Sequence, residues 1–174
     1  MTASGMTASH ASTVDTPLGP FTVLVDGDGA VLASGWTADL HALLPQVAPA
    51  LRPTQPQWRA ELGAVTGAVA AYHRGELSAV DAVAVRQHSG SFLQQAWDVL
   101  RGVPAGAPVS YTELAAKAGR PEAVRAAASA CARNAAALFV PCHRVLRSDG
   151  SLGGFRWGTT VKRWLLKHEA SGLR

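Results

Sequence analysis

Hydrophobic and polar positions in the first half of the chain form short runs separated by turn residues. Residues 21–25 (FTVLV) and 30–34 (AVLAS) are β-prone, and Asp-Gly-Asp-Gly at 26–29 lies between them. Two such runs around a glycine-containing loop predict a β-hairpin. Weak alternation over 79–85 predicts a further strand, whereas the pattern over 38–52 fits a helix or a strand.

One apolar stripe in the first half has helical spacing. Leu62, Val65, Val69 and Tyr72 fall at positions i, i+3, i+7 and i+10, so they share one face of a 3.6-residue helix. Gly75 follows them and is a typical helix stop. Together with the hairpin, this helix predicts a small α/β domain built around a short sheet.

The second half is predicted to be mainly helical. We expect a first helix that Ser91 caps and that runs through Leu100, with Phe92, Ala96 and Val99 facing inward. A serine hydroxyl at a helix start accepts a hydrogen bond from an otherwise unpaired backbone N–H.

Two further helices follow a capping box. Ser110 and Glu113 have the S-x-x-E spacing, in which each side chain accepts a hydrogen bond from the backbone N–H of the other. The box predicts a short helix through Ala118, and after a turn at 119–121 a second helix extends from about Glu122 to Arg133. This spacing predicts a helix-turn-helix unit.

The last of these helices has two unlike faces. Its small residues would let it lie close to a duplex backbone, although an alanine-rich packing helix is the alternative. The apolar stripe is Val124, Ala127, Ala128 and Cys131, and the polar stripe is Arg125, Ser129 and Arg133.

Composition and charge narrow the class of protein. Of 174 residues, 48% are apolar and 16% are charged, which excludes a disordered solvated chain as the dominant state. Residues 1–90 carry four arginines against seven acids, a net charge of −3, and residues 91–174 carry twelve basic residues against five acids, a net charge of +7. A cationic second half indicates a polyanionic partner such as nucleic acid; a solvated basic surface is the alternative.

Cysteine content and the chain start bear on the compartment and on domain limits. The sequence has only two cysteines, Cys131 and Cys142. Two cysteines are too few for a disulfide-rich scaffold or a four-cysteine zinc site. No apolar run approaches the roughly 18 residues that span a bilayer, so we expect a cytoplasmic protein without a membrane partner. Residues 1–15 lack the features of a secretory signal and are expected to be a flexible leader. We place an α/β domain at 16–87 and a helical domain at 91–174.

The stretch with the most evident chemistry is 138–145 (LFVPCHRV), where an apolar segment delivers Cys142, His143 and Arg144 in succession. A thiol reacts as the thiolate, which burial disfavours, so a reactive Cys142 needs a nearby base or cation. Neighbouring side chains in an extended segment point to opposite sides. We therefore expect a water between Cys142 and His143; a structural buried thiol is the alternative.

Several blocks of the second half together resemble one known family. The sequence VPCHRV at 140–145, with Asn134 eight residues before the cysteine, is similar to the active-site signature of the O6-alkylguanine-DNA alkyltransferases. The Arg-Trp-Gly at 156–158 is similar to the Ada type of methyltransferase domain. The resemblance implies a ribonuclease H-like first domain and a second domain with a helix-turn-helix. The other similar blocks are residues 109–111, 121–134, 154–158 and 164–169.

The resemblance also implies an activity. Members of the family move the alkyl group of O6-alkylguanine in DNA irreversibly to their own cysteine, so each molecule acts once. By resemblance this chain is a monomeric, single-turnover methyltransferase of direct DNA repair that needs no cofactor and no metal, with O4-alkylthymine as a minor substrate. Its partner is double-stranded DNA containing O6-alkylguanine. Because a stacked guanine cannot present O6 to a buried thiolate, the damaged base must be flipped.

Carried over to this sequence, the family's catalytic residues fall at four positions. The resemblance implies that Cys142 is the nucleophile and that His143 and Glu169 form a relay which deprotonates it through a water. It implies that Asn134 is a hinge between the recognition helix and the active-site segment; a helix C-cap is the alternative for this asparagine. A helix-end surface acid is the alternative for Glu169.

The remaining implied residues contact DNA. Tyr111 assists rotation of the nucleotide, Arg125 fills the gap left by the flipped base, and Ser129 and Arg133 lie on the same helix. A core aromatic and a solvated arginine are the alternatives for the first two. Bulky Trp157 is expected to narrow the pocket and favour methyl over benzyl groups. The implied base pocket comprises Tyr111, the Val145 carbonyl, Phe155, Arg156 and Trp157.

Two other classes of function remain compatible with the residues alone. One is a non-catalytic DNA-binding module, which the thiol and its implied relay disfavour. The other is a cysteine hydrolase or redox enzyme that uses Cys142 and His143, which the cationic second half disfavours.

Overall fold

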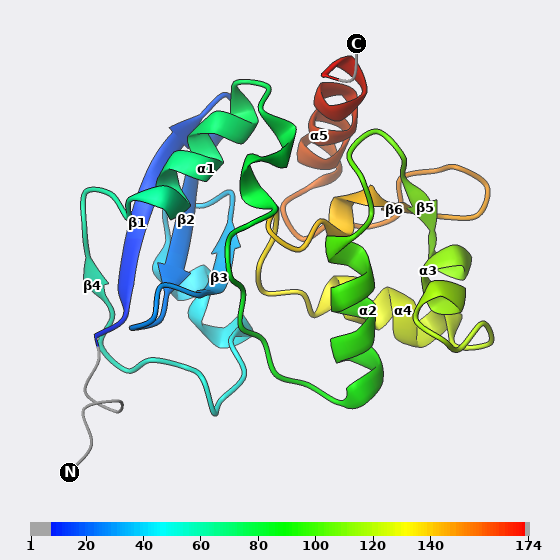
Figure 1. Cartoon of the computed structure of the whole chain (residues 1–174), viewed down its shortest axis with the longest axis horizontal. Helices are drawn as coiled ribbons and strands as arrows, with labels where there is room; N and C mark the ends of the chain where they lie inside the picture. Colours follow the sequence, from blue (N-terminus) through cyan, green and yellow to red (C-terminus); the bar gives the residue numbers. More distant parts are fainter. Residues whose placement is uncertain (1–7, 173–174) are drawn as a thin grey trace. The chain divides into compact units, whose positions relative to one another are not determined.

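The computed structural model describes residues 8–172, which divide into two compact units between His88 and Ser89 (Figure 1). The first unit contains a four-stranded sheet and one α-helix, and the second contains four α-helices and a two-stranded ladder. The expected α/β character of the first half and helical character of the second are both present.

The sheet of the first unit has the strand order β3-β2-β1-β4. Antiparallel pairing joins β1 to β2 and β2 to β3, whereas β4 is parallel to β1. The predicted hairpin is confirmed as β2 and β3. Asp26 holds its turn, because Oδ1 accepts hydrogen bonds from the backbone N–H groups of Asp28 (2.9 Å) and Ala30 (3.0 Å). The strands are β1 His10–Thr16, β2 Gly19–Val25, β3 Val31–Gly35 and β4 Gln57–Trp58.

The prediction of a flexible leader over residues 1–15 is wrong for residues 10–15. Residues 10–15 belong to β1, which pairs with β2 from His10↔Val25 to Thr16↔Gly19. Ala11 is fully buried, so small side chains here serve close packing rather than flexibility. Residues 1–7 of the expected leader lie outside the described residues.

Helix α1, Ala64–His73, confirms the helix predicted in the first half. It packs against β1 (Figure 1). Val69 and Tyr72 of the predicted stripe are fully buried, which joins the helix to the core of this unit. The chain leaves through Gly75 at φ 115°, a left-handed conformation that glycine adopts without strain.

The strand expected over 79–85 is wrong. A 3-10 helix, Leu77–Val80, takes in the first two residues of this segment, a turn follows it, and only Val85 forms a β-bridge, to Val31. Leu77 and Val80 are both buried three residues apart, so the packing of one helical turn outweighs the weak alternation. The ambiguous segment 38–52 contains two further 3-10 helices, Leu40–Ala42 and Leu44–Gln46.

The second unit confirms the predicted helices. The capping box is present, since the Ser110 Oγ accepts from the Glu113 N–H at 3.0 Å and the Glu113 Oε1 accepts from the Ser110 N–H at 2.9 Å. The elements are α2 Ser91–Arg101, β5 Val109–Ser110, α3 Tyr111–Lys117, α4 Val124–Ala132, the 3-10 helix Cys142–Arg144, β6 Val145–Leu146 and α5 Thr159–Ser171.

Two helix faces differ from expectation. The N-cap of α2 is Gly90 rather than Ser91, and the helix is rotated so that Trp97 can donate from Nε1 to the Ala130 carbonyl of α4 at 2.9 Å. The side chains that α2 buries are Ala96, Trp97 and Leu100, not the expected set of Phe92, Ala96 and Val99. On α4 the buried residues are Ala127 and Ala130, and the expected stripe of Val124, Ala127, Ala128 and Cys131 is otherwise partly or fully exposed.

Across residues 8–172, no helix combines the length and the apolar character needed to cross a membrane.

Candidate active site

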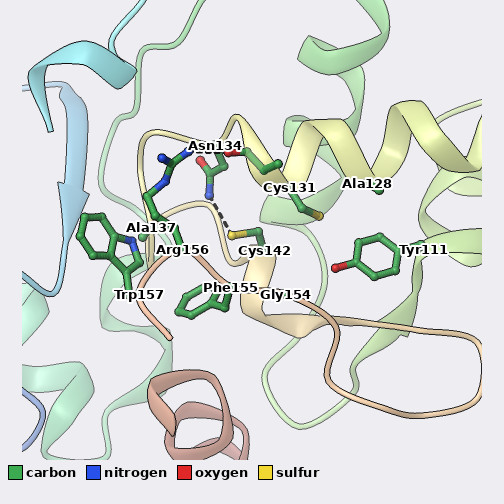
Figure 2. A pocket seen from close by; sticks show the side chains of 11 residues that line it. Tyr111, Ala128, Cys131, Asn134, Ala137, Cys142, Gly154, Phe155, Arg156 and Trp157 are labelled. Atoms are coloured by element: carbon green, nitrogen blue, oxygen red, sulfur yellow. Dashed lines mark hydrogen bonds between the residues drawn. The ribbon is translucent and has the colours of Figure 1, made fainter. Parts of the chain in front are cut away.

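A cavity of about 440 Å³ lies within the second unit, which is in the size range of small-ligand sites. Figure 2 shows the Cys142 and Asn134 side chains meeting at one side of it, with Tyr111 on the other side. The lining comes from α3, α4, the segment around Cys142 and the loop before α5. Its residues are Tyr111, Ala128, Cys131, Ala132, Asn134, Ala137, Cys142, Gly154, Phe155, Arg156 and Trp157.

Cys142 begins a short 3-10 turn at the end of a buried segment. Its backbone N–H donates to the Val140 carbonyl at 2.8 Å, which fixes the position of the side chain. Burial raises the pKa of the thiol, while the hydrogen bond from Asn134 and the positive charges of Lys162 and Arg156 oppose that rise. The site therefore holds a thiol that gains its negative charge only with help from these neighbours.

Asn134 joins the end of α4 to the segment that carries the thiol. Its Nδ2 donates to the Val140 carbonyl at 2.8 Å and to the Cys142 Sγ at 3.3 Å. Its Oδ1 accepts from the Ala136 N–H at 3.0 Å. The helix C-cap is Arg133, not Asn134, so this amide serves the thiol segment rather than the helix end.

His143, Arg144 and Glu169 form one buried network. The Glu169 Oε2 accepts from His143 Nε2 at 2.7 Å and from Arg144 Nη2 at 2.9 Å, and Oε1 accepts from Arg144 Nε at 2.9 Å. Burial alone would raise the pKa of Glu169, but the bonds from His143 and Arg144 lower it to about 2. Glu169 is fully buried, so the surface-acid interpretation is wrong.

The network sets the proton arrangement of the imidazole. Burial lowers the pKa of His143, against the opposing effect of Glu169, so the ring is neutral. A carboxylate can only accept, so Nε2 of His143 carries the hydrogen and Nδ1 carries the lone pair. Nδ1 is buried and makes no hydrogen bond within the described part of the chain. It is thus an unpaired acceptor next to Cys142 in the chain.

Two charged residues of this region went unassigned in the sequence. Arg144 also donates from Nη1 to the Val103 carbonyl at 2.7 Å. Lys162 is 1% exposed and donates to backbone carbonyls beside the cavity. The burial of Lys162 could have been predicted from the sequence, because Lys162, Leu165 and Glu169 fall at i, i+3 and i+7 and so share one helix face. These three are the buried residues of α5.

The expected pocket residues are only partly brought together. Tyr111, Phe155, Arg156 and Trp157 line the cavity, whereas Val145 does not. The Val145 carbonyl instead accepts from Lys162 Nζ at 2.8 Å. Cys131, Ala128 and Gly154 also line the cavity, although they were not expected there.

The Tyr111 side chain lies close to the backbone of the loop before α5. Burial raises the pKa of the Tyr111 phenol to about 12, so the hydroxyl stays protonated. A Cβ at Gly153 would lie 3.1 Å from that hydroxyl, and Gly153 has φ 71°. Arg156, which also lines the cavity, donates to the Ala132 carbonyl at the end of α4, at 2.5 Å. The lack of a side chain at Gly153 thus leaves room for Tyr111, and the Arg156 bond ties this loop to the end of α4.

The polar stripe of α4 lies outside the cavity lining. Arg125 and Arg133 are exposed and Ser129 is half-buried. Within residues 8–172, no group of three or more His, Cys, Asp or Glu side chains could hold a metal ion.

Comparisons with known proteins place the chain in a family. A family model described as 6-O-methylguanine DNA methyltransferase, DNA binding domain, matches residues 91–171. The bifunctional transcriptional activator/DNA repair enzyme Ada of Escherichia coli is 55% identical over 80 residues, which are 46% of this chain. The chain spans only 23% of the length of Ada in that match.

Other relatives match over nearly their whole length. The methylated-DNA–protein-cysteine methyltransferase of Mycobacterium tuberculosis is 36% identical over 165 residues, 93% of each chain. The crystal structure of Mycobacterium tuberculosis O6-methylguanine methyltransferase superposes with a TM-score of 0.76 at 30% identity over 95% of each chain. The structure of the same organism's protein in complex with DNA gives 0.78 at 29% identity over 94% of each chain. This chain therefore belongs to the methylated-DNA–protein-cysteine methyltransferase family.

Proposed function

We propose that this chain repairs DNA by moving the methyl group of O6-methylguanine to the Sγ of Cys142. The observation that carries the proposal is a buried thiol facing a cavity of about 440 Å³, in a chain related over 93% of its length to a methylated-DNA–protein-cysteine methyltransferase. The S–C bond forms as the C–O6 bond breaks, and the purine keeps the electron pair. The proton lost by the thiol balances the one that guanine gains at N1.

In this mechanism His143 is the base and Glu169 orients it. The neutral ring holds its lone pair at Nδ1, and Glu169 accepts from Nε2 at 2.7 Å. A water between Nδ1 and Cys142 would carry the thiol proton to the imidazole, and Glu169 would stabilise the imidazolium that results. Asn134 donates to the sulfur at 3.3 Å, which favours the thiolate.

The α3–α4 pair is the proposed DNA-binding unit, a helix-turn-helix. The exposed arginines of the α4 polar stripe, Arg125 and Arg133 with Ser129 between them, support contact with phosphates and with the gap left by a flipped base. Flipping follows from the position of the thiol, since Cys142 is 7% exposed at the side of a cavity. Minor-groove binding would suit a protein that must act at any sequence.

The first unit is proposed to be ribonuclease H-like. Its strand order β3-β2-β1-β4, with β4 parallel to β1 and the first three strands antiparallel, supports this assignment. Substrate range is proposed from the cavity wall. Trp157 reduces the room for large alkyl groups, so methyl is preferred to benzyl, and O4-methylthymine is a minor substrate.

Intact mass spectrometry tests the function. We expect a mass increase of one methylene on mixing the protein with a duplex containing O6-methylguanine, and peptide mapping should place it on Cys142. Cys142→Ala should show no increase while it still binds the duplex, and Cys131→Ala is the matched control because it removes the other thiol of the cavity. Transfer that persists in Cys142→Ala, or turnover of a small ester without DNA, would refute the proposal.

A further inference from the structure

Lys162 is a buried cation that the mechanism above does not use. Its side chain is 1% exposed, and Nζ donates to the carbonyls of Val145 at 2.8 Å, Gly154 at 3.4 Å and Leu152. Three acceptors occupy all three N–H donors of an ammonium group. No carboxylate lies within ion-pair distance of Nζ in residues 8–172. A fully buried lysine without a carboxylate partner is rare.

The other buried charges near the thiol cancel one another. Glu169 is bound by Arg144 through two hydrogen bonds of 2.9 Å, and His143 is neutral. The positive charge of Lys162 therefore has no counterpart when Cys142 is a thiol. It gains one when Cys142 becomes a thiolate, and a nearby ammonium favours that form.

The three carbonyls belong to two different segments of the site. Val145 directly follows the 3-10 turn Cys142–Arg144, and Gly154 lines the cavity beside Phe155. One side chain thus joins the nucleophile segment to the loop that forms a wall of the cavity. Without it, these two segments would lose a shared anchor, and the sulfur would lose its buried positive neighbour.

We propose that Lys162 is a positioning residue that provides the counter-charge for the Cys142 thiolate and holds the 152–154 loop against the nucleophile segment. The proposal deepens the proposed function, because it assigns the residue that makes the thiolate accessible at neutral pH. Burial lowers the pKa of the Lys162 ammonium while a thiolate at Cys142 raises it, and Lys162 lowers the pKa of Cys142. The two groups therefore favour each other's charged forms.

Single-turnover methyl transfer between pH 6 and pH 10 tests the proposal in the full chain. Lys162→Met should move the rate profile to higher pH by about one unit, about tenfold less transfer at neutral pH. Lys162→Gln, which keeps N–H donors without a charge, should show the same shift. Lys162→Arg, which keeps the charge, should retain the wild-type position of the profile. Lys167→Met, on the exposed side of the same helix, is the matched control and should match wild type.

The pH readout separates a counter-charge from a purely structural brace. Loss of a brace alone would lower the rate by one factor at every pH. The other polar or charged groups that interact with Cys142 or Lys162 are unchanged in all four variants: Asn134, Arg156, Cys131, Tyr111 and Arg147.

A second probe separates this proposal from the proposed function. Iodoacetamide alkylates thiolates without DNA, and peptide mass mapping distinguishes Cys142 from Cys131. A shifted Cys142 profile in Lys162→Gln would support the counter-charge even if wild type took no methyl group from DNA, an outcome that would refute the proposed function alone. Coincident Cys142 profiles in wild type and in whichever of Lys162→Met and Lys162→Gln folds would overturn the role of Lys162.

Discussion

Replacing Glu169 by Gln removes the only negative charge of the buried network while keeping the shape of the side chain. In the folded protein the carboxylate accepts three hydrogen bonds of 2.7–2.9 Å from His143 and Arg144. Its pKa falls from 4.5 to about 2, and this difference corresponds to about 3 kcal/mol of folding free energy at pH 7. Leaving the Arg144 guanidinium buried without its anion has a cost of about the same size, roughly 3–5 kcal/mol.

The sign of the pH dependence follows from the direction of that shift. Because folding lowers the pKa of Glu169, its contribution to stability is complete well above pH 4.5 and is lost as the pH falls through 4.5 toward 2. We expect Glu169→Gln to lower the free energy of unfolding by about 3 kcal/mol at pH 7. The difference in the free energy of unfolding between wild type and variant should shrink between pH 5 and pH 2. His143 and Arg144 remain in place in the variant.

Urea denaturation followed by circular dichroism, repeated at several pH values, measures this gap. Glu122→Gln is the control, because Glu122 is exposed and its contact with Arg120 is long at 3.7 Å; it should change stability by less than about 0.5 kcal/mol. A loss of unfolding free energy in Glu169→Gln below about 1 kcal/mol at pH 7, or a loss that stays constant down to pH 3, would refute the reasoning.

Three further outcomes test the site. Arg125→Ala should slow transfer from duplex DNA about tenfold and leave transfer from a single strand unchanged, because only the duplex needs its gap filled; rates on the two substrates decide this. Trp157→Gly should raise inactivation by O6-benzylguanine relative to O6-methylguanine, and an unchanged ratio would remove the proposed size selection. Gly153→Ala should lower stability by about 1–2 kcal/mol, because φ is 71° and the added Cβ would lie 3.1 Å from the Tyr111 hydroxyl. Gly154→Ala, with open space around it, is its denaturation control.

Elements with local determinants were predictable from the chain alone. The β2–β3 hairpin depends on the Asp26 turn, and α3 depends on the reciprocal capping of Ser110 and Glu113, all within a few residues. Helix α1 follows from the spacing of its own apolar residues, two of which, Val69 and Tyr72, are fully buried. The adjacent thiol and imidazole were likewise visible as neighbours in one apolar run. In each case the residues that interact are also close in sequence.

Other features depend on partners that are distant in the chain. Residues 10–15 form a strand because β2 pairs with them, and the segment 79–85 fails to form one because Leu77 and Val80 bury a helical turn. The buried face of α2 is set by the bond from Trp97 to α4.

The electrostatics of the site were decided in the same way. Glu169 is 26 residues from His143, and Lys162 reaches a carbonyl 17 residues away. Composition and spacing show that such charged groups exist. Which of these groups are buried away from solvent, and which protein groups then bind them in place of water, depends on the folded chain. Desolvation of a group depends on every element packed around it.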